Sequence, residues 1–366
     1  MTNSGSVSFF LGANTPEGFH SLFSGLYFPE LGWQLYIIKG GPGTGKSTLM
    51  KKIAAECDKR GLFCERIFCS SDPTSLDAVI IPSLKISIAD GTSPHVIEPM
   101  YPGVAEKFID LGQFRGDTLL AENRDEIIAG TKENSLCHKK CIDFLFAARG
   151  CENDTASVVI PTMKMAVLHR FAEKLAEIKL NSHSMPKGSL SGRFLSAFTP
   201  AGFVIFDNTF DALCEKKILL KDSFGCASSV ILRVLAMKAA EKGIRGYICH
   251  SPLYPDHRPE QLIFPDLSLG FYVTDSRTAE KSEAVQFIDC MRFYDREALS
   301  RHKNRLAFNK RSRDEMLSAA IESLKKAKSV HDELEKYYIS AMDFSAMKDY
   351  SDTLIREIFS RRPYDA

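Results

Sequence analysis

The feature that most constrains the fold is an internal repeat with a period of about half of the 366-residue chain. Three segments of the first half return in the second half, in the same order. They are TPEGF at 15–19 and TPAGF at 199–203, YIIK at 36–39 and ILLK at 218–221, and IPSL at 81–84 and FPDL at 264–267. The offsets between the matches are 182 to 184 residues. Ordered matches at nearly one offset predict a tandem duplication of a structural unit.

Each copy begins with an α/β pattern. In the first copy the expected strands cover residues 34–38, 66–69 and 86–89. Helical spacing covers residues 47–60 and stops at Gly61, whereas residues 76–84 suggest a poorly defined crossover. Strands that alternate with helices in this way predict a parallel sheet with right-handed crossovers.

A helical part follows in each copy. From about residue 117 the β pattern stops, and apolar side chains recur at helical intervals through 136–148 and 163–178. The second copy has the same pattern through 317–334 and 344–359. Stripes of this kind are ordinarily packing faces. Residues 181–192 are rich in Ser, Gly and Pro and are expected to link the copies.

Residues 40–47 read GGPGTGKS and satisfy the pattern G-x-x-x-x-G-K-[ST]. The motif stands between a strand pattern and a helical pattern, which is the context that it requires. Its glycines let the backbone bend around a phosphate and direct N–H groups inward, and the start of the helix adds its positive end. The residues expected to bind nucleotide are Gly40, Gly41, Pro42, Gly43, Thr44, Gly45, Lys46, Ser47 and Thr48.

The motif predicts a distinct role for each polar side chain. Lys46 should reach the β- and γ-phosphates, and the Ser47 hydroxyl should bind Mg²⁺. Thr48 is included in the segment, although it can simply continue the helix. ATP is preferred to GTP because the chain lacks an N-K-x-D guanine motif: NKRS at 309–312 lacks its acid. The alternative is an ordinary glycine-rich turn.

A P-loop also needs an acid to hold the metal or its water, usually at the end of the neighbouring strand. Asp90 ends the apolar run before Gly91 and is the expected metal ligand, with a simple turn-forming role as the alternative. Asp72, before Pro73, is a second candidate as a metal ligand or as a base toward an acceptor, or a turn residue. His95 is a candidate substrate contact, or a surface or core residue.

The second copy lacks these groups. DSFGCASS at 222–229 stands opposite the motif. The replacements are Gly45 by Ala227, Lys46 by Ser228, Asp72 by Tyr254 and Asp90 by Val273. We expect a folded copy that does not hydrolyse nucleotide and that packs on the first copy or supplies groups to it. Asp222 at the mouth should repel phosphate, although Gly225 and the helix start leave a weak anion site open.

Charge and cysteine content limit the partners. The chain has 47 basic and 46 acidic residues, a net charge of +1, so it lacks the field of a general nucleic-acid binder. Residues 301–313 contain six basic and no acidic residues, which we interpret as a solvated helix face rather than a phosphate-binding patch. Residues 1–14 do not read as a secretory signal, and no segment reaches membrane-spanning length.

The ten cysteines include no C-x-x-C pair and predict free thiols in a cytoplasmic protein. Cys137, His138 and Cys141 share a helical face, but a tetrahedral metal site needs two further ligands. We therefore interpret these two cysteines as small buried hydrophobic residues.

Several motifs together resemble a bacterial family of duplicated P-loop proteins labelled ATP-binding protein, ATPase or nucleotide kinase. They are the loop at 40–47, Asp72-Pro73, Leu76-Asp77, IPSL at 81–84 and DGTSPH at 90–95. The resemblance covers nearly the whole chain and implies ATP binding, but it implies no particular substrate. Ala227 and Ser228 depart from a pattern with two nucleotide sites.

The sequence thus predicts an α/β protein, a tandem duplication of a P-loop NTPase-type parallel sheet unit with a helical segment after each copy. The expected parts are a P-loop domain at 1–116, a helical segment and linker at 117–192, a degenerate copy at 193–295 and a helical segment at 296–366.

The expected function is Mg²⁺-dependent ATP hydrolysis or phosphoryl transfer to an unidentified acceptor, with Lys46, Asp72 and Asp90 as the catalytic candidates. The alternative is a nucleotide-dependent switch that acts on a protein partner without turnover. A motor that acts on nucleic acid has the least support. Arg115, Arg193 and Arg245 are available as an arginine finger, and nothing in the sequence ranks them.

Overall fold

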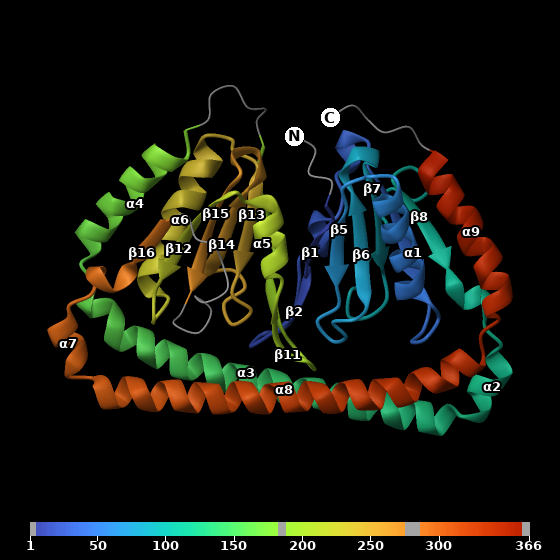
Figure 1. The fold of residues 1–366 in the computed structure, drawn as a ribbon. Helices are drawn as coiled ribbons and strands as arrows, with labels where there is room; N and C mark the ends of the chain where they lie inside the picture. The colour runs from blue at the N-terminus through green and yellow to red at the C-terminus, as the bar shows by residue number, and fades with distance from the viewer. Residues whose placement is uncertain (1–4, 182–187, 275–285, 361–366) are drawn as a thin grey trace.

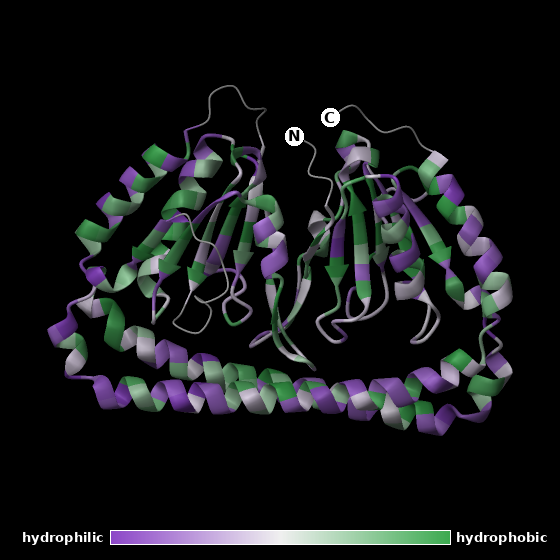
Figure 2. Ribbon diagram, in the orientation of Figure 1, coloured by the Kyte–Doolittle hydropathy of each residue, from purple (hydrophilic) through white to green (hydrophobic). Residues whose placement is uncertain are grey.

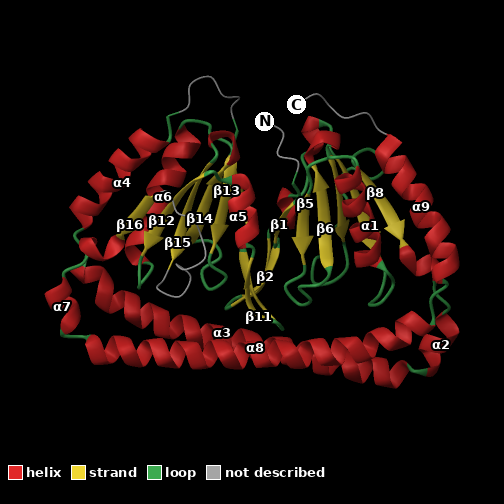
Figure 3. Ribbon diagram, in the orientation of Figure 1, coloured by secondary structure: helices red, strands yellow, loops and turns green. Residues whose placement is uncertain are grey.

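Two α/β lobes lie side by side, and two long helices run beneath both (Figure 1). The computed structural model describes residues 5–181, 188–274 and 286–360. The start of the chain and most of the expected linker, residues 1–4 and 182–187, lie outside the described residues. Figure 3 shows that the helices surround the two sheets.

The first lobe contains a six-stranded sheet of order β1-β5-β6-β7-β4-β8. Its strands are β1 (Val7–Phe9), β4 (Gln34–Lys39), β5 (Glu65–Phe68), β6 (Leu76–Ile81), β7 (Ile86–Asp90) and β8 (Glu106–Asp110). Helix α1 (Lys46–Lys59) connects β4 to β5, and β2 (Gly12–Thr15) pairs with β3 (Gly18–Ser21) in a hairpin. The short 3₁₀ helices are η1 (Phe23–Gly25), η2 (Pro29–Leu31), η3 (Pro82–Leu84) and η4 (Leu111–Phe114).

The second lobe repeats this order as β9-β13-β14-β15-β12-β16. Its strands are β9 (Leu190–Arg193), β12 (Lys216–Lys221), β13 (Gly246–His250), β14 (Pro259–Phe264), β15 (Leu269–Thr274) and β16 (Gln286–Asp289). The hairpin β10 (Ser196–Thr199) and β11 (Gly202–Ile205), helices α5 (Asp207–Leu213) and α6 (Cys226–Glu241), and the turns η6 (Pro265–Leu267) and η7 (Cys290–Phe293) complete it. Equal strand order in both lobes is what a tandem duplication requires. Strand β9 lies across the boundary expected at residue 193.

Both sheets are mixed, so the prediction of a parallel sheet was wrong. Strand β6 runs antiparallel to β5 and β7, and β14 runs antiparallel to β13 and β15. The segment interpreted as a crossover contains β6 followed by η3, and Lys85 closes the reversal with a left-handed φ of 52°. A connection this short cannot return a strand in parallel, which takes a dozen or more residues.

The helical segments cross to the opposite lobe. They consist of α2 (Asp117–Glu122), α3 (Arg124–Val159), η5 (Ile160–Thr162), α4 (Met165–Lys179), α7 (Arg296–Ser300), α8 (Lys303–Ser340) and α9 (Phe344–Ser360). Helix α3 runs from the first lobe to the second, where α4 packs on α6, and α8 returns so that α9 packs on the first lobe (Figure 1). Each sheet is therefore covered by the helix that follows the other copy.

The long helices and the lobes are joined by apolar contacts. Cys141 and Leu145 of α3 pack with Ala320 and Leu324 of α8. In Figure 2 the strands are largely hydrophobic, whereas α8 alternates between hydrophilic and hydrophobic residues. Alternation of this kind is typical of a helix with one buried face.

The two lobes share a buried interface. Phe10 and Phe194 exchange backbone hydrogen bonds of 2.8 and 2.9 Å. Beside them Arg193 donates to Glu65 at 2.9 Å, and the Tyr247 hydroxyl donates to the same carboxylate at 2.9 Å. Buried apolar residues of both lobes form a common core around this ion pair. The copies are therefore parts of one folded body.

Candidate functional site

The loop at residues 40–45 connects β4 to α1, as the sequence predicts. Strand β4 lies between β7 and β8 and is parallel to both. Gly43 and Gly45 have φ values of 65° and 86°, in the left-handed region that favours glycine. No side chain caps the start of α1, where Gly45 is the N-cap residue. The helix start is thus suited to an anion.

Lys46 and Asp90 meet at this loop. The Lys46 ammonium donates to the carbonyls of Gly40 at 3.1 Å and Gly41 at 2.8 Å, and its Nζ lies 3.6 Å from Asp90 Oδ2. Asp90 ends β7 and also accepts from the backbone N–H of Thr92 at 2.8 Å. Asp90 therefore forms the turn and pairs with Lys46 at the same time.

The other polar residues of the motif hold the loop. Thr44 is buried and donates to the Gly41 carbonyl at 2.9 Å. The Ser47 hydroxyl accepts from the backbone N–H of Leu76 at 3.0 Å, which joins α1 to β6. Thr48 is exposed and continues the helix. Of Thr44, Ser47 and Thr48, only Ser47 has its hydroxyl at the start of the helix in a position suited to bind a metal ion.

Asp72 lies in the turn between β5 and β6. It accepts from the N–H and hydroxyl of Thr74 at 3.1 and 2.8 Å and from the Ser75 hydroxyl at 2.9 Å, and it lies 3.7 Å from Lys328 Nζ of α8. Burial raises its pKa, but these hydrogen bonds and the lysine prevail, so the pKa lies below its ordinary value. Asp72 thus connects the turn to α8, whereas Asp90 faces Lys46.

The end of α8 covers the loop. The backbone N–H of Gly43 donates to Glu335 Oε1 at 3.2 Å. A Cβ at Gly41 would lie 2.7 Å from the Tyr338 ring, and one at Gly43 would lie 2.8 Å from Ile339. These glycines therefore also make room for α8. The Gly43 N–H thus already has an anionic acceptor, a carboxylate oxygen of α8.

Sequence reasoning missed this contact. Glu335 is 292 residues from Gly43, and nothing in the local pattern of α8 marks it. A hydrogen bond with His331 lowers the pKa of Glu335, burial opposes this, and the Gly43 N–H adds to the lowering. The net pKa of Glu335 is below its ordinary value, so the group is a carboxylate at neutral pH.

A second cluster lies at the same edge of the sheet. The sequence singled out His95 but not Cys69 or Asp77 as its neighbours. His95 is 6% exposed and packs between the rings of Phe19 and Phe23. Its Nε2 lies 3.0 Å from Asp77 Oδ2. Cys69 joins them, and one ligand atom from each of the three residues lies within 4.8 Å of the others. No spacing motif marks these residues, because three different loops and strands bring them together.

The loop of the second copy has a different conformation. Gly225 has a φ of 68°, as Gly43 has 65°. Ala227 replaces the left-handed Gly45, and α6 begins at Cys226, two positions before the counterpart of Lys46. An alanine strongly disfavours positive φ. The helix therefore extends into the segment that forms a loop in the first copy.

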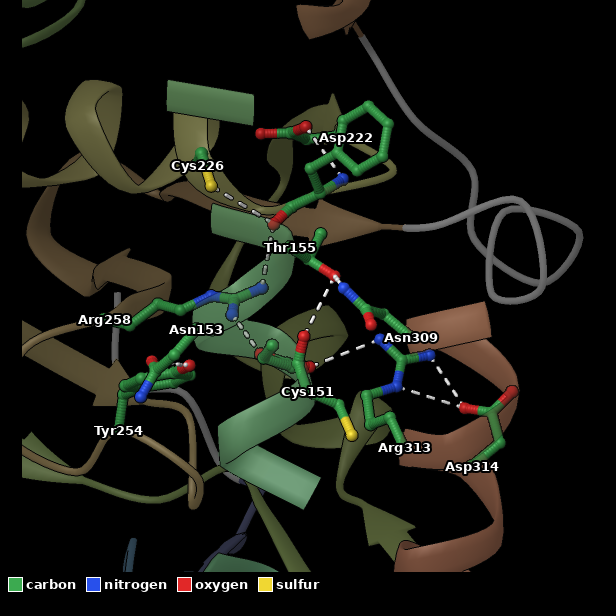
Figure 4. A network of polar contacts seen from close by, with 12 residues as sticks. Cys151, Asn153, Thr155, Asp222, Cys226, Tyr254, Arg258, Asn309, Arg313 and Asp314 are labelled. Carbon is green, nitrogen blue, oxygen red and sulfur yellow. Dashed lines mark hydrogen bonds and ion pairs between the residues drawn. The ribbon is translucent and has the colours of Figure 1, made fainter. Parts of the chain in front are cut away.

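Asp222 is not at the mouth of this loop, as the sequence suggested, but is buried beneath it (Figure 4). Its carboxylate accepts from the N–H groups of Phe224 at 3.2 Å and Ser228 at 2.8 Å. The Tyr294 hydroxyl donates to Asp222 at 2.9 Å and accepts from the Ala227 N–H at 2.9 Å. The amides of Phe224, Ala227 and Ser228 therefore already have acceptors within the protein, which disfavours the weak anion site that the sequence left open.

A cavity of about 830 Å³ lies between this degenerate loop and helices α3 and α8. Figure 4 shows the polar network at its wall. Arg258 donates to Glu152 at 2.6 Å, and Arg313 donates to the same carboxylate at 3.3 Å and to Asp314 at 2.8 Å. The loop of the second copy thus faces a cavity whose wall carries two arginines and two acids.

The basic residues at 301–313 are used within the molecule. Arg301 pairs with Glu297 of α7, four residues earlier in the chain, at 2.9 Å. Arg305 donates to Asp154 of α3, and Arg313 contacts Glu152 of the same helix. Acidic residues of α3 thus neutralise part of the positive charge at 301–313, so a bound phosphate is not needed to explain it.

The structure ranks the three candidate arginines by position. Arg193 is buried in the interface between the lobes, and Arg245 pairs with Asp266 of the second copy at 2.8 Å. Arg115 follows η4 after β8, the strand beside β4, and its Nη2 lies 2.9 Å from Asp117. Arg115 is therefore the candidate on the side of the first-copy loop.

Among the helices of the described chain, none is both long and apolar enough to cross a bilayer. Comparisons with protein-family models, curated proteins and solved structures give no match to this chain.

Proposed function

We propose that the first copy is a P-loop NTPase that binds ATP with Mg²⁺ and hydrolyses it or transfers its γ-phosphoryl group. The observation that carries the proposal is the position of Lys46 Nζ, on the loop carbonyls and 3.6 Å from Asp90 Oδ2. A lysine after a glycine loop and an acid at the end of the next strand are the pair with which P-loop NTPases hold phosphates and metal.

The residues present fit the nucleotide. The Gly43 N–H already holds one anionic oxygen, from Glu335, so it is directed at an anion. Lys46 would exchange two carbonyl contacts for phosphate oxygens, and Ser47 with Asp90 would hold Mg²⁺. The bound ion supplies charge neutralisation, and the chain positions the phosphates and the attacking group.

The direct test is a titration with Mg²⁺ and ATP that counts sites per chain. We expect one site in the wild type, and about 100-fold weaker binding or none in Lys46→Ala. Ser228→Ala, at the counterpart position of the second copy, is the matched control and should leave binding unchanged. A protein that ignores ATP would overturn the proposal, and two strong sites would contradict the inactive second copy.

A nucleotide-dependent switch is the second candidate, favoured by the contact of α8 with the loop. ATP needs the Gly43 N–H that Glu335 occupies, so the end of α8 must move for the nucleotide to bind. Helix α8 continues beneath both lobes (Figure 1), so a displacement can reach the second lobe. This candidate needs binding without turnover.

Steady-state ADP release separates the two candidates. Release without an added acceptor indicates hydrolysis, and release that depends on an acceptor indicates phosphoryl transfer. Binding with no release, together with faster hydrogen exchange at residues 335–347 when ATP is added, indicates the switch. Lys46→Ala should abolish each of these responses.

A further inference from the structure

Cys69, Asp77 and His95 form a compact cluster beside the nucleotide loop. Cys69 directly follows β5, Asp77 is the second residue of β6, and His95 lies in the loop after β7. Asp77 and His95 are 5% and 6% exposed, and Cys69 is partly buried. The strands place a thiol, a carboxylate and an imidazole at one edge of the sheet.

Only one side of the imidazole is paired within the cluster. Asp77 Oδ2 lies 3.0 Å from His95 Nε2, which forms a buried ion pair when the imidazole is protonated. His95 Nδ1 is buried and has no hydrogen-bond partner among the residues that the structure describes. Buried polar atoms are nearly always satisfied, so the unpartnered Nδ1 indicates that the cluster lacks a partner for one of its groups.

The distances fit one shared metal ion. Ligand atoms of a tetrahedral zinc ion lie about 3.3–3.6 Å apart, given Zn–N and Zn–O bonds of roughly 2.0–2.2 Å and Zn–S bonds of about 2.3 Å. The ligand atoms here lie within 4.8 Å of one another. Small movements of the side chains, without a change of rotamer, would bring them to these distances. The buried aromatic rings of Phe19 and Phe23 fix the imidazole.

We propose that Cys69, Asp77 and His95 bind a Zn²⁺ ion, which is distinct from the Mg²⁺ that accompanies ATP. A set of sulfur, nitrogen and oxygen donors selects zinc over magnesium, which prefers oxygen ligands alone. Binding replaces the S–H bond of Cys69 by an S–Zn bond and releases that proton to solvent, while neutral His95 donates a nitrogen lone pair.

Three protein ligands leave the fourth tetrahedral position for a water molecule. The ion would hold the β5–β6 turn and the loop after β7 together, and this loop directly follows Asp90. Ser251 and Glu260 stand at the positions of Cys69 and Asp77 in the second copy. The thiol is therefore absent from the copy that also lacks the P-loop lysine.

The test measures zinc per chain in the purified protein by elemental mass spectrometry, without nucleotide. We expect one equivalent, and its loss in Cys69→Ser and His95→Asn. Affinity should fall by more than the roughly 10–100-fold that follows loss of an outer-shell partner. Cys151→Ser, at a partly buried cysteine outside the cluster, and Asp72→Asn are the matched controls and should keep the zinc.

Cobalt provides a second measurement that does not depend on variants. Wild-type protein stripped of metal and loaded with Co²⁺ should show a thiolate-to-cobalt charge-transfer band and tetrahedral ligand-field bands, and Zn²⁺ should remove both. Absence of zinc and of the cobalt spectrum, or zinc that persists in both cluster variants, would overturn the proposal. Lys46→Ala should lose ATP binding and keep zinc, so a failure of either proposal is seen separately.

Discussion

At the scale of single residues, a carboxylate accepts from backbone amides of the loop in each copy, although not at corresponding positions. Glu335 reaches the Gly43 N–H from α8, whereas Asp222 reaches the Phe224 and Ser228 N–H groups from within its own loop. Glu335 can leave with the end of its helix. Asp222 has no such freedom, because it is buried and holds the helix start. The carboxylate that contacts the loop therefore belongs to a separate helix in the first copy and to the loop itself in the second.

Removal of the Glu335 carboxylate should strengthen ATP binding, because the nucleotide no longer competes with it for the Gly43 N–H. We expect Glu335→Gln to lower Kd by roughly 3–10-fold, or about 1 kcal/mol for a half-exposed group. Glu333→Gln is the matched control, because Glu333 pairs with Lys336 on the exposed side of α8. Equal Kd values for the two variants would contradict this role.

Asp90 and Asp72, the two candidate acids, should behave differently. Asp90 lies beside Lys46, so Asp90→Asn should reduce turnover on the order of 100-fold or more through loss of a metal ligand. Asp72 is used by its turn and by Lys328, so Asp72→Asn should change turnover far less. Steady-state turnover rates of both variants at saturating Mg²⁺ show which acid binds the metal. A greater loss of turnover in Asp72→Asn than in Asp90→Asn would assign the metal to Asp72 instead.

The lowered pKa of Asp72 also predicts a pH dependence of stability. Because the folded pKa is below the unfolded value of 3.8, the ionised turn stabilises the protein above that value. The stabilisation is lost as pH falls through the lower folded pKa. The melting temperature of the wild type should therefore fall more steeply below pH ~4 than that of Asp72→Asn. Parallel pH curves would exclude the contribution.

At the scale of elements, three of the substitutions that distinguish the second-copy loop from the first have separate effects. Ala227 extends α6, Ser228 lacks the ammonium, and Asp222 fills the amides. A variant with Ala227→Gly and Ser228→Lys should therefore remain unable to bind ATP. Adding Asp222→Gly restores the full G-x-x-x-x-G-K-S pattern and frees the amides.

We expect a second, weaker ATP site in this triple variant, weaker because Val273 still stands where Asp90 does. The measurement is the number of ATP sites per chain by calorimetry, with the double variant as the control and melting curves to verify folding. A second site in the double variant would show that Asp222 does not block the loop.

At the scale of the whole molecule, the exchange of helices makes each half dependent on the other. Helix α4 follows the first copy but packs on α6, and α9 follows the second copy but packs on α1. The buried pair of Arg193 and Glu65 also spans the halves. Separation would expose these apolar faces and leave charges unpaired.

The halves 1–187 and 188–366 should therefore be insoluble or poorly folded when produced alone and should associate when produced together. Co-elution in size-exclusion chromatography and recovery of ATP binding in the mixed sample check this. Arg245→Ala, which breaks an exposed pair within the second lobe, is a control that should not affect association. Stable isolated halves would contradict the dependence.

Four features were predictable from the amino-acid sequence: the duplication, the strand–loop–helix junction at residues 40–47, the acid at the end of β7 and the helical character of the later segments. These features are local: a motif, a periodicity and a repeat each act over neighbouring residues, so a linear pattern records them. The antiparallel course of β6 was missed, because a 3₁₀ turn and a left-handed Lys85 are weak signals in a sequence.

Only the tertiary structure decided which helix covers which sheet, what occupies the two loops and which side chains surround them. Glu335 meets Gly43 across 292 residues of sequence, and Cys69, Asp77 and His95 meet because β5 and β7 end and β6 begins at one edge of the sheet. An apolar helical stripe specifies that a face is buried but not against which partner. Contacts between distant segments depend on how the elements pack, and this information is not contained in any local pattern.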